Sequence, residues 1–297
     1  MTEHVTVTDP RAGGPSATLR AYVELTKPRI IELLLTTTLP AMIVAAEGWP
    51  GWWLAITTLI GGTLSAAGGN VINQVMDADI DRVMRRTRGR PIPTGRVAPR
   101  HALWFGVGLG IAGFAWLWAT TNLLAAILST AGLLFYVLVY TRLLKRSTKQ
   151  NIVIGGAAGA VPVLVGWAAV TGSLAVPALV MFGIVFFWTP PHFWALALRW
   201  EDDYRAAGVP MLPVVVGVQK TLNQISLYSV LTAGVSLLLV PFMGWIYLIA
   251  AIGLGSALIA GAFVLRARPN QAMRYFAATN VYLAGLFLAI AGDGLLL

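Results

Sequence analysis

Nine apolar segments follow one another along this 297-residue chain, separated by polar or glycine-containing connections. They lie at 30–47, 52–76, 102–120, 122–140, 152–171, 174–198, 224–243, 246–265 and 275–296. An apolar stretch of about 18 or more residues crosses the hydrocarbon core of a bilayer as a helix. Helices satisfy their own backbone polar groups, which lipid cannot do. We therefore predict an all-α integral membrane protein, a bundle of about nine transmembrane helices.

The composition agrees with this fold class. Only 11% of the residues are charged, whereas soluble domains carry about 25%. The first 28 residues are polar and lack the apolar core of a signal peptide. We expect residues 1–28 to form a flexible cytoplasmic tail and residues 29–297 to form a single membrane domain. Cysteine is absent, which excludes disulfides, thiolate metal sites and cysteine nucleophiles.

The positive charges are segregated along the chain. The net charge is +9, and all 21 Lys and Arg residues fall in the tail or in the loops near 77–101, 141–150, 199–223 and 266–274. The intervening connections carry none. Because Lys and Arg are enriched in cytoplasmic loops, this alternation predicts nine spans with a cytoplasmic N-terminus. Membrane topology and contact with anionic lipid account for most of the charge, so we do not expect nucleic-acid binding.

One helix face near the predicted end of the second span is acidic. Asn73, Asp77 and Asp81 are four residues apart, and each such step turns about 40° around a helix, so their side chains share a face. Carboxylates at this depth are costly unless they are paired or bound to a cation. These oxygen ligands suit Mg²⁺ that bridges to phosphate. The alternative is an acidic helix end paired with neighbouring arginines. Asp79 lies off this face and is expected to be solvated.

A run of arginines between Arg82 and Arg96 follows directly after the acidic face. Guanidinium groups fork onto phosphate oxygens, so a basic loop beside a metal-binding face suits a diphosphate. The candidate diphosphate-binding residues are Arg85, Arg86, Arg90, Lys145, Arg146 and Arg205.

A second acidic cluster, Glu201-Asp202-Asp203, follows the sixth span, and it also precedes a proline-containing turn. We expect the two acidic helix ends to face each other and to form a two-sided site for a metal and a diphosphate. The candidate catalytic residues are Asn73, Asp77, Asp81, Asp202 and Asp203, and the candidate metal ligands are Asn73, Asp77, Asp81 and Asp203.

His192 lies in the segment Thr189-Pro-Pro-His-Phe-Trp194, close to the cytoplasmic end of the sixth span. The paired prolines predict a kink or a break, which membrane helices tolerate where the backbone lines a cavity. A histidine in this position would be an iron ligand, a proton carrier or a hydrogen-bonded structural residue. Its position alone leaves the three roles open.

Three stretches of the sequence resemble the UbiA-type intramembrane prenyltransferases, and in particular their heme O synthase branch. The matching stretches are 73–96 (NQVMDADIDRVMRRTRGRPIPTGR), 140–172 (YTRLLKRSTKQNIVIGGAAGAVPVLVGWAAVTG) and 187–217 (FWTPPHFWALALRWEDDYRAAGVPMLPVVVG). The resemblance implies a nine-helix bundle around a central cavity, in the plasma membrane of a prokaryote. It also implies Mg²⁺-dependent transfer of the farnesyl group of farnesyl diphosphate to a vinyl group of protoheme IX.

The resemblance assigns roles to residues of this chain. The first acidic motif of the family corresponds to Asn73, Asp77 and Asp81. The second motif is often Asp-x-x-x-Asp, whereas this chain has Glu201-Asp202-Asp203-Tyr204, so which carboxylate binds the metal stays open. The Pro-Pro-His-Phe-Trp stretch makes His192 the candidate for contacting heme. The partners that the resemblance suggests are the lipid bilayer and heme A synthase or oxidase assembly proteins.

Two other functions stay open at this point. One is a prenyltransferase of the same type that acts on an aromatic quinone precursor. The other is a transporter, which would carry ionisable groups near the middle of the bilayer. The largely apolar spans favour an enzyme that houses an isoprenoid.

Overall fold

The structure is a computed structural model that describes residues 14–296, apart from the side chains of residues 29, 30 and 32–35. Every regular element in this range is helical. The α-helices are α1 (Pro15–Thr26), α2 (Pro28–Ala45), α3 (Trp52–Met76), α4 (Ala78–Val83), α5 (Pro99–Thr120), α6 (Leu123–Leu134), α7 (Asn151–Thr171), α8 (Val176–Arg199), α9 (Glu201–Ala206), α10 (Leu212–Val216), α11 (Val218–Leu237), α12 (Trp245–Ala267) and α13 (Ala272–Gly294). A π-helix, η1 (Phe135–Leu144), continues α6, and two short 3₁₀ helices are η2 (Val240–Phe242) and η3 (Pro269–Gln271).

The predicted membrane fold is confirmed. Within the described residues, eight helical segments are long and apolar enough to span a bilayer, with α6 and η1 forming one of them. The first predicted span, 30–47, coincides with α2, whose described apolar part is the shorter stretch Thr36–Ala45. The prediction of about nine spans is therefore close to the structure.

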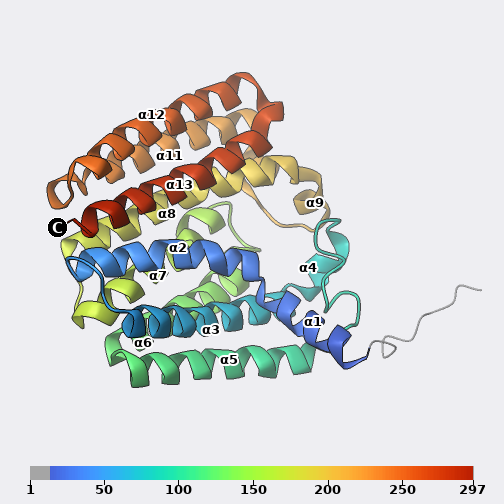
Figure 1. The fold of residues 1–297 in the computed structure, drawn as a ribbon. Helices are drawn as coiled ribbons and strands as arrows, with labels where there is room; N and C mark the ends of the chain where they lie inside the picture. Colours follow the sequence, from blue (N-terminus) through green and yellow to red (C-terminus); the bar gives the residue numbers. More distant parts are fainter. Residues whose placement is uncertain (1–13, 297) are drawn as a thin grey trace, which may run out of the picture.

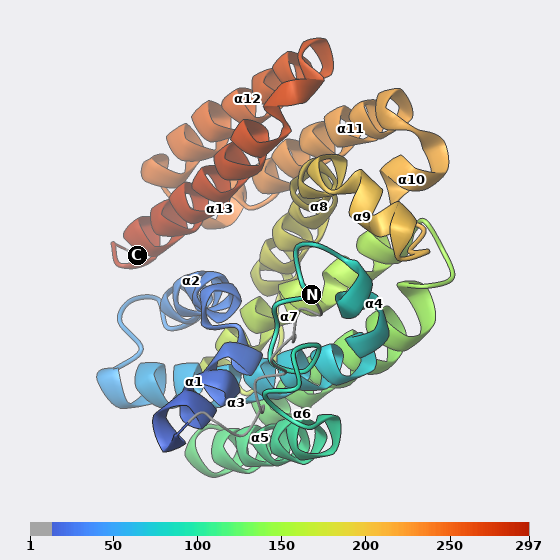
Figure 2. The ribbon, with the colours of Figure 1, turned by 90° about the vertical axis from the view of Figure 1, so that its right-hand side faces the viewer.

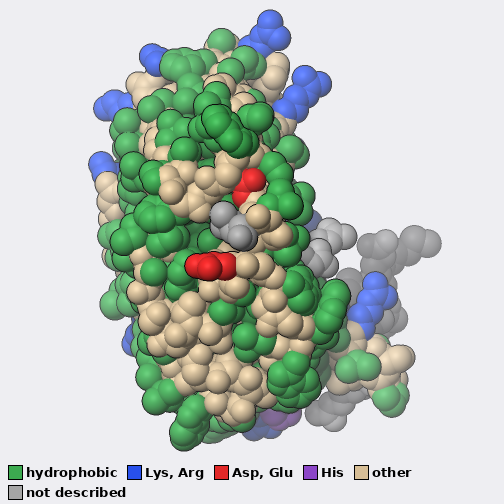
Figure 3. All heavy atoms as spheres, turned by 60° about the vertical axis from the view of Figure 1, so that its left-hand side comes forward, with side chains coloured by type: hydrophobic (Ala, Val, Ile, Leu, Met, Phe, Trp, Pro, Cys, Tyr) green, Lys and Arg blue, Asp and Glu red, His purple; other side chains and the backbone are tan. Residues whose placement is uncertain are grey.

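The long helices run side by side as an elongated bundle (Figures 1 and 2). Helices α11, α12 and α13 lie at one side, α3, α5 and α6 lie at the other, and α2, α7 and α8 lie between them. Helix α13 packs on α2, α8 and α12, and α7 packs on α2, α6 and α8. Hydrophobic side chains spread over the face shown in Figure 3, with Lys and Arg at its margins. An apolar exterior of this kind suits contact with lipid.

The short helices gather at one end of the bundle. Helices α1, α4 and α9 lie at the right-hand end of Figure 1, and the C-terminus lies at the opposite end. Helix α1 corrects the prediction of a flexible tail over Pro15–Thr26, because its residues Ala21 and Leu25 are buried in a small cluster with Val71 of α3. Residues 1–13 of the predicted tail lie outside the described residues.

The predicted span at 224–243 is displaced from its helix. Helix α11 begins at Val218 and ends at Leu237. Gly217, with φ of +80°, adopts a backbone conformation that favours glycine and precedes the first turn. The first turns of α11 are polar, and Pro241 falls in the following 3₁₀ turn. Hydropathy thus located the apolar part of the segment rather than the ends of the helix.

Candidate active site

The predicted acidic face lies at the junction of α3 and α4 and turns into the protein. Asn73, Asp77 and Asp81 are 4%, 1% and 2% exposed, whereas the Asp79 side chain is 66% exposed. Helical hydrogen bonds continue through the junction, from the Asp77 amide to the Asn73 carbonyl and from the Asp81 amide to the Asp77 carbonyl. This continuity keeps the three buried side chains on one face, as their spacing predicts.

Asp77 is the centre of a polar network that joins the end of α3 to η1 and to the start of α2. Its Oδ2 accepts hydrogen bonds from Lys145 at 2.5 Å and from the Asn73 side chain at 2.8 Å. The Asn73 amide group also donates to the Thr141 hydroxyl of η1 at 3.1 Å, and its Oδ1 accepts from Lys27 at 2.9 Å. Lys27, between α1 and α2, was not among the predicted site residues. The site therefore assembles from the start of α2, the end of α3, and η1.

The two acidic loops meet through an arginine. Arg85, which follows α4, forms an ion pair of 2.8 Å with Asp203 of α9. The Arg86 backbone amide donates to the other carboxylate oxygen of Asp203 at 3.2 Å, and the Arg86 guanidinium contacts the Tyr204 hydroxyl at 3.4 Å. Asp81 forms its own ion pair with Arg90 at 2.6 Å. The expected proximity of the two loops is therefore present, with arginines between their carboxylates.

Other predicted site residues lie nearer the surface. Asp202 is exposed, while Asp203 beside it is buried. Arg205 pairs with Glu201 along the surface of α9. Arg146 forms a two-pronged pair with Asp79 at 2.7 Å, and one of its nitrogens lies 4.0 Å from Asp77. The structure thus brings Arg146 to the acidic cluster and leaves Asp202 and Arg205 at its edge.

The surroundings shift the ionisation of three groups. Burial, together with the neighbouring cations Arg90 and Lys145, lowers the pKa of Lys27 to about 7. Hydrogen bonds from Arg146 lower the pKa of Asp79 to about 2. Burial would raise the pKa of Asp203, but its bonds to Arg85 and to the Arg86 backbone outweigh burial and lower it. The two carboxylates stay ionised at neutral pH, whereas Lys27 titrates there.

The donor atoms at the junction fit a divalent cation that is shared with a substrate. Asp77 Oδ1 is buried and accepts no hydrogen bond, and a water or a cation satisfies a buried polar atom of this kind. Among the described residues, no group of three or more His, Asp or Glu side chains forms a protein-only metal cluster. Mg²⁺ is commonly held by one or two carboxylates together with substrate phosphates. The arrangement suits that mode of binding.

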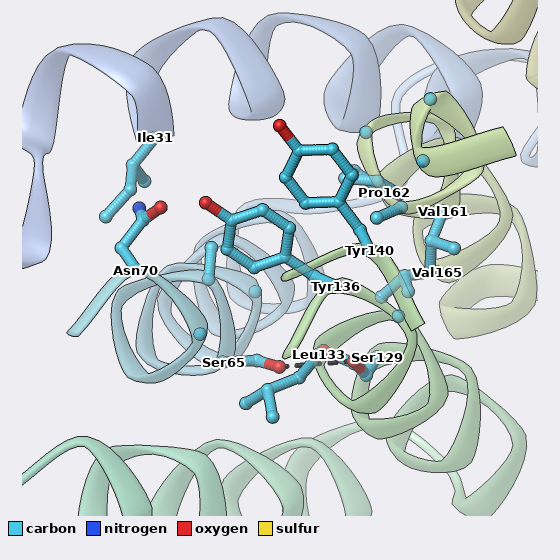
Figure 4. Close-up of a pocket in the computed structure, with 18 of the residues that line it drawn as sticks. Ile31, Ser65, Asn70, Ser129, Leu133, Tyr136, Tyr140, Val161, Pro162 and Val165 are labelled. Carbon is cyan, nitrogen blue, oxygen red and sulfur yellow. Dashed lines mark hydrogen bonds between the residues drawn. The ribbon is translucent and has the colours of Figure 1, made fainter. Parts of the chain in front are cut away.

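An apolar cavity of about 310 Å³ adjoins this network. It is bounded by α2, α3, α6, η1, α7 and α8, and Figure 4 shows its lining residues. Tyr136 and Tyr140 of η1 stand side by side in its wall, with stacked rings 5.7 Å apart and their hydroxyls on the same side. Asn70, one helical turn before Asn73, also lines the cavity. The cavity therefore ends close to the acidic cluster.

The π-helix η1 contributes residues to both the apolar cavity and the polar network around Asp77. Its π-helical turns carry the two tyrosines into the cavity and Thr141 to Asn73. Pi-helical turns are frequent at functional sites, and nothing in the hydrophobic pattern of the sequence marks this one.

Glycines shape the cavity wall. Gly156 packs against Thr189 of α8, where a Cβ atom would lie 3.0 Å from the threonine Cβ, so this glycine allows α7 and α8 to approach closely. Gly62 of α3 and Gly159 of α7 also line the cavity, and a Cβ on either would meet no atom within 4 Å. Side chains at these two positions would extend into the cavity.

His192 lies on α8 and faces α13. Its Nδ1 is 2.7 Å from the hydroxyl of Thr279, and its ring stacks between Trp188 and Phe276. Its neighbours Thr189 and Phe193 line the cavity, and His192 is not among the lining residues. The sequence predicts a kink or a break at Pro190 and Pro191, and of these two the break is absent, because helix α8 is continuous from Val176 to Arg199. The sequence did not reveal Thr279 as the partner of His192.

A buried carboxylate and amide cluster, ringed by cations, at the end of an apolar cavity within a membrane bundle is typical of an enzyme that handles a prenyl diphosphate. The chain belongs to the UbiA prenyltransferase family, which matches residues 34–290. It is 53% identical over 287 residues to protoheme IX farnesyltransferase 2 of Saccharopolyspora erythraea, covering 95% of this chain and 89% of that relative. It is 51% identical over 284 residues to the protoheme IX farnesyltransferase of Mycolicibacterium smegmatis, covering 94% and 92%.

Solved structures share the fold at lower sequence identity. The chain aligns with a digeranylgeranylglyceryl phosphate synthase structure with a TM-score of 0.77 and 22% identity, covering 94% of this chain and 99% of that chain. It aligns with a UbiA homologue from Archaeoglobus fulgidus bound to DMAPP and Mg²⁺ with a TM-score of 0.64 and 17% identity, covering 91% and 98%. These likenesses confirm the UbiA fold that the loop sequences predict.

Proposed function

We propose that this protein is a heme O synthase, which transfers the farnesyl group of farnesyl diphosphate to a vinyl group of protoheme IX. One observation carries the proposal: the buried cluster around Asp77 lies close to the end of an apolar cavity and to five basic side chains. The protoheme IX farnesyltransferases of two bacteria, at 51–53% identity over almost the whole chain, support the choice of acceptor.

The basic residues would hold the diphosphate. Lys27 and Lys145 contact the Asn73–Asp77 pair, and Arg85, Arg86 and Arg90 surround Asp81 and Asp203. A diphosphate that takes these cations would free carboxylate oxygens of Asp77, Asp81 and Asp203. Those oxygens and Asn73 Oδ1 are the groups that would hold Mg²⁺, which supplies charge neutralisation to the leaving diphosphate. Positioned cations stabilise the charge that develops as the allylic C–O bond breaks.

The cavity would hold the farnesyl chain. Its lining is apolar, so water is excluded from the allylic carbon while the diphosphate leaves. The stacked rings of Tyr136 and Tyr140 present π faces in the wall, and aromatic faces attract a positive charge. His192 lies on the face of α8 that is turned towards α13, and we assign it the role of contacting the heme.

The basic end of the bundle would face the cytoplasm. The described Lys and Arg residues lie in the connections at the end that carries α1, α4 and α9, which follows the rule for cytoplasmic loops. In this proposed orientation, the start of α1 and the diphosphate site would both face the cytoplasm.

Purified full-length protein with farnesyl diphosphate, Mg²⁺ and protoheme IX tests the proposal. We expect mass spectrometry to detect hydroxyethylfarnesyl heme, because the vinyl group bonds to the allylic carbon, the diphosphate leaves and water adds to the other vinyl carbon. EDTA should abolish its formation. A parallel reaction with 4-hydroxybenzoate tests the quinone-precursor alternative. Prenylation of 4-hydroxybenzoate without conversion of protoheme would overturn the assignment of the acceptor.

A further inference from the structure

Thr279 of α13 is held against α8 by hydrogen bonds to its backbone carbonyl and to its side-chain hydroxyl. Its backbone carbonyl accepts from the indole Nε1 of Trp188 at 2.7 Å, and its hydroxyl oxygen lies 2.7 Å from His192 Nδ1. Thr279 is fully buried. The rings of Trp188 and Phe276 stack on the two sides of the imidazole, with centroids 4.2 and 4.3 Å from it. The imidazole is therefore fixed in both position and orientation.

The Thr279 hydroxyl decides which nitrogen of His192 carries the proton. Its oxygen lies 2.7 Å from the carbonyl oxygen of Phe276 as well as from His192 Nδ1. A hydroxyl has one hydrogen, and a carbonyl only accepts. With the hydroxyl hydrogen directed to the Phe276 carbonyl, the hydroxyl offers His192 a lone pair. Nδ1 must then donate, so in the neutral ring Nε2 holds the free lone pair.

We propose that Thr279 is a positioning residue that fixes this tautomer of His192 and presents the Nε2 lone pair to the iron of protoheme. Histidines that bind a metal commonly donate their other ring N–H to an oxygen, which sets the tautomer and the ring orientation. Imidazole nitrogen is a common ligand of heme iron. The stacked rings of Trp188 and Phe276 prevent the imidazole from rotating, so only its edge is presented. This inference rests on the proposed function, because it takes protoheme as the second substrate.

Titration of ferric protoheme IX into the purified, detergent-solubilised full chain tests the proposal by absorption spectroscopy. Thr279→Val keeps the shape of the side chain and removes the hydroxyl, while Thr279→Ser restores the hydroxyl. Thr232→Val is the matched control, because Thr232 of α11 is also buried and its hydroxyl donates to a carbonyl of its own helix at 2.7 Å. His192→Ala defines the spectrum without the imidazole.

We expect Thr279→Val to weaken protoheme binding about tenfold, as loss of such an outer partner does at metal sites, and to shift the Soret band towards that of His192→Ala. The KM for farnesyl diphosphate should stay unchanged, and Thr279→Ser and Thr232→Val should match the parent protein. Parent affinity and spectrum in Thr279→Val would overturn the role of Thr279, even if His192→Ala loses both. Binding that changes in Thr279→Val while the parent protein fails to farnesylate protoheme would support the tautomer role and reject the proposed function.

Discussion

The Lys27 ammonium group donates a hydrogen bond of 2.9 Å to Asn73 Oδ1, and so occupies an oxygen that the sequence predicts as a metal ligand. Lys27 lies at the junction of α1 and α2, in the left-handed backbone conformation with φ of 54°. The Asn73 amide group in turn donates to Asp77, so a chain of two hydrogen bonds links the Lys27 ammonium group to the Asp77 carboxylate. This relationship makes the site sensitive to pH.

Farnesyl diphosphate binding should weaken as pH rises through the pKa of Lys27. That pKa is about 7, so the side chain is cationic below neutral pH and increasingly neutral above it. A bound diphosphate favours the cation, and loss of one coupled proton weakens binding by at most about tenfold per pH unit. The measurement is the KM for farnesyl diphosphate between about pH 6 and about pH 9.

Two variants separate Lys27 from other titrating groups. Lys27→Met should raise this KM at low pH and flatten its pH dependence, because no charge remains to be lost. Lys27→Arg should flatten the profile while keeping tight binding, since a guanidinium stays protonated. A profile in Lys27→Met as steep as in the parent protein would assign the titration to the substrate or to another residue.

Asp77→Asn should abolish farnesyl transfer without unfolding the protein. The amide keeps the shape of the side chain and its bond to Asn73, but it removes the charge that pairs with Lys145 and the buried Oδ1 that has no other partner. Loss of a group that stabilises transition-state charge costs on the order of a hundredfold or more in kcat. Asp81→Asn should behave in the same way. Turnover is measured by product formation in membranes.

Asp79→Asn is the matched control for both variants, because Asp79 lies two residues from each of them on the exposed side and pairs with Arg146 at the surface. Its turnover should stay within about threefold of the parent value, as expected for an exposed ion pair. Near-normal transfer by Asp77→Asn would remove Asp77 from the proposed metal site.

Gly159→Val should change the preferred length of the prenyl donor. A side chain there would enter the cavity, because a Cβ meets no atom within 4 Å. We expect the ratio of kcat/KM for farnesyl to geranyl diphosphate to fall about tenfold or more, as for steric loss of a few methylene contacts. Gly108→Val on α5 is the control, since Gly108 is exposed on the bundle surface and its Cβ is equally unhindered. An unchanged ratio in Gly159→Val would place the prenyl chain elsewhere.

The sequence predicted those parts of the site that depend on local periodicity. Asn73, Asp77 and Asp81 share a buried face because a helix repeats every 3.6 residues, and their spacing alone reveals this. The membrane spans were predictable because hydropathy also depends only on residues that are neighbours in the sequence. The burial of Asp203 beside exposed Asp202 was not predictable, because it depends on which side of α9 meets Arg85.

Contacts between segments that are far apart in the chain could not be predicted from a single sequence. Arg85 meets Asp203 across 118 positions, and His192 meets Thr279 across 87. Lys27 was assigned to a tail because α1 and the α1–α2 junction are short and polar. The similar plan of the two acidic loops predicted a two-sided site, and the resemblance to a known family agreed with it, but neither predicted the ion pairs of the site.

Asp293→Ala should destabilise the far end of the bundle without changing the chemistry. Asp293 is buried within the last span, and its Oδ2 accepts a hydrogen bond of 2.7 Å from the Tyr247 backbone amide. Tyr247 is in the first turn of α12, whose N-cap residue Gly244 has no side chain to accept from that turn. The carboxylate of α13 therefore supplies the cap, and its charge favours the positive end of the α12 dipole. Removal of such a cap costs about 1–2 kcal/mol, so thermal unfolding in detergent should occur at lower temperature, while KM for both substrates stays at the parent value.

Asp293→Asn is the control, because it keeps an oxygen that can accept the hydrogen bond. Its unfolding temperature should fall less than that of Asp293→Ala. Equal unfolding temperatures for Asp293→Ala and the parent protein would show that the cap contributes nothing to stability.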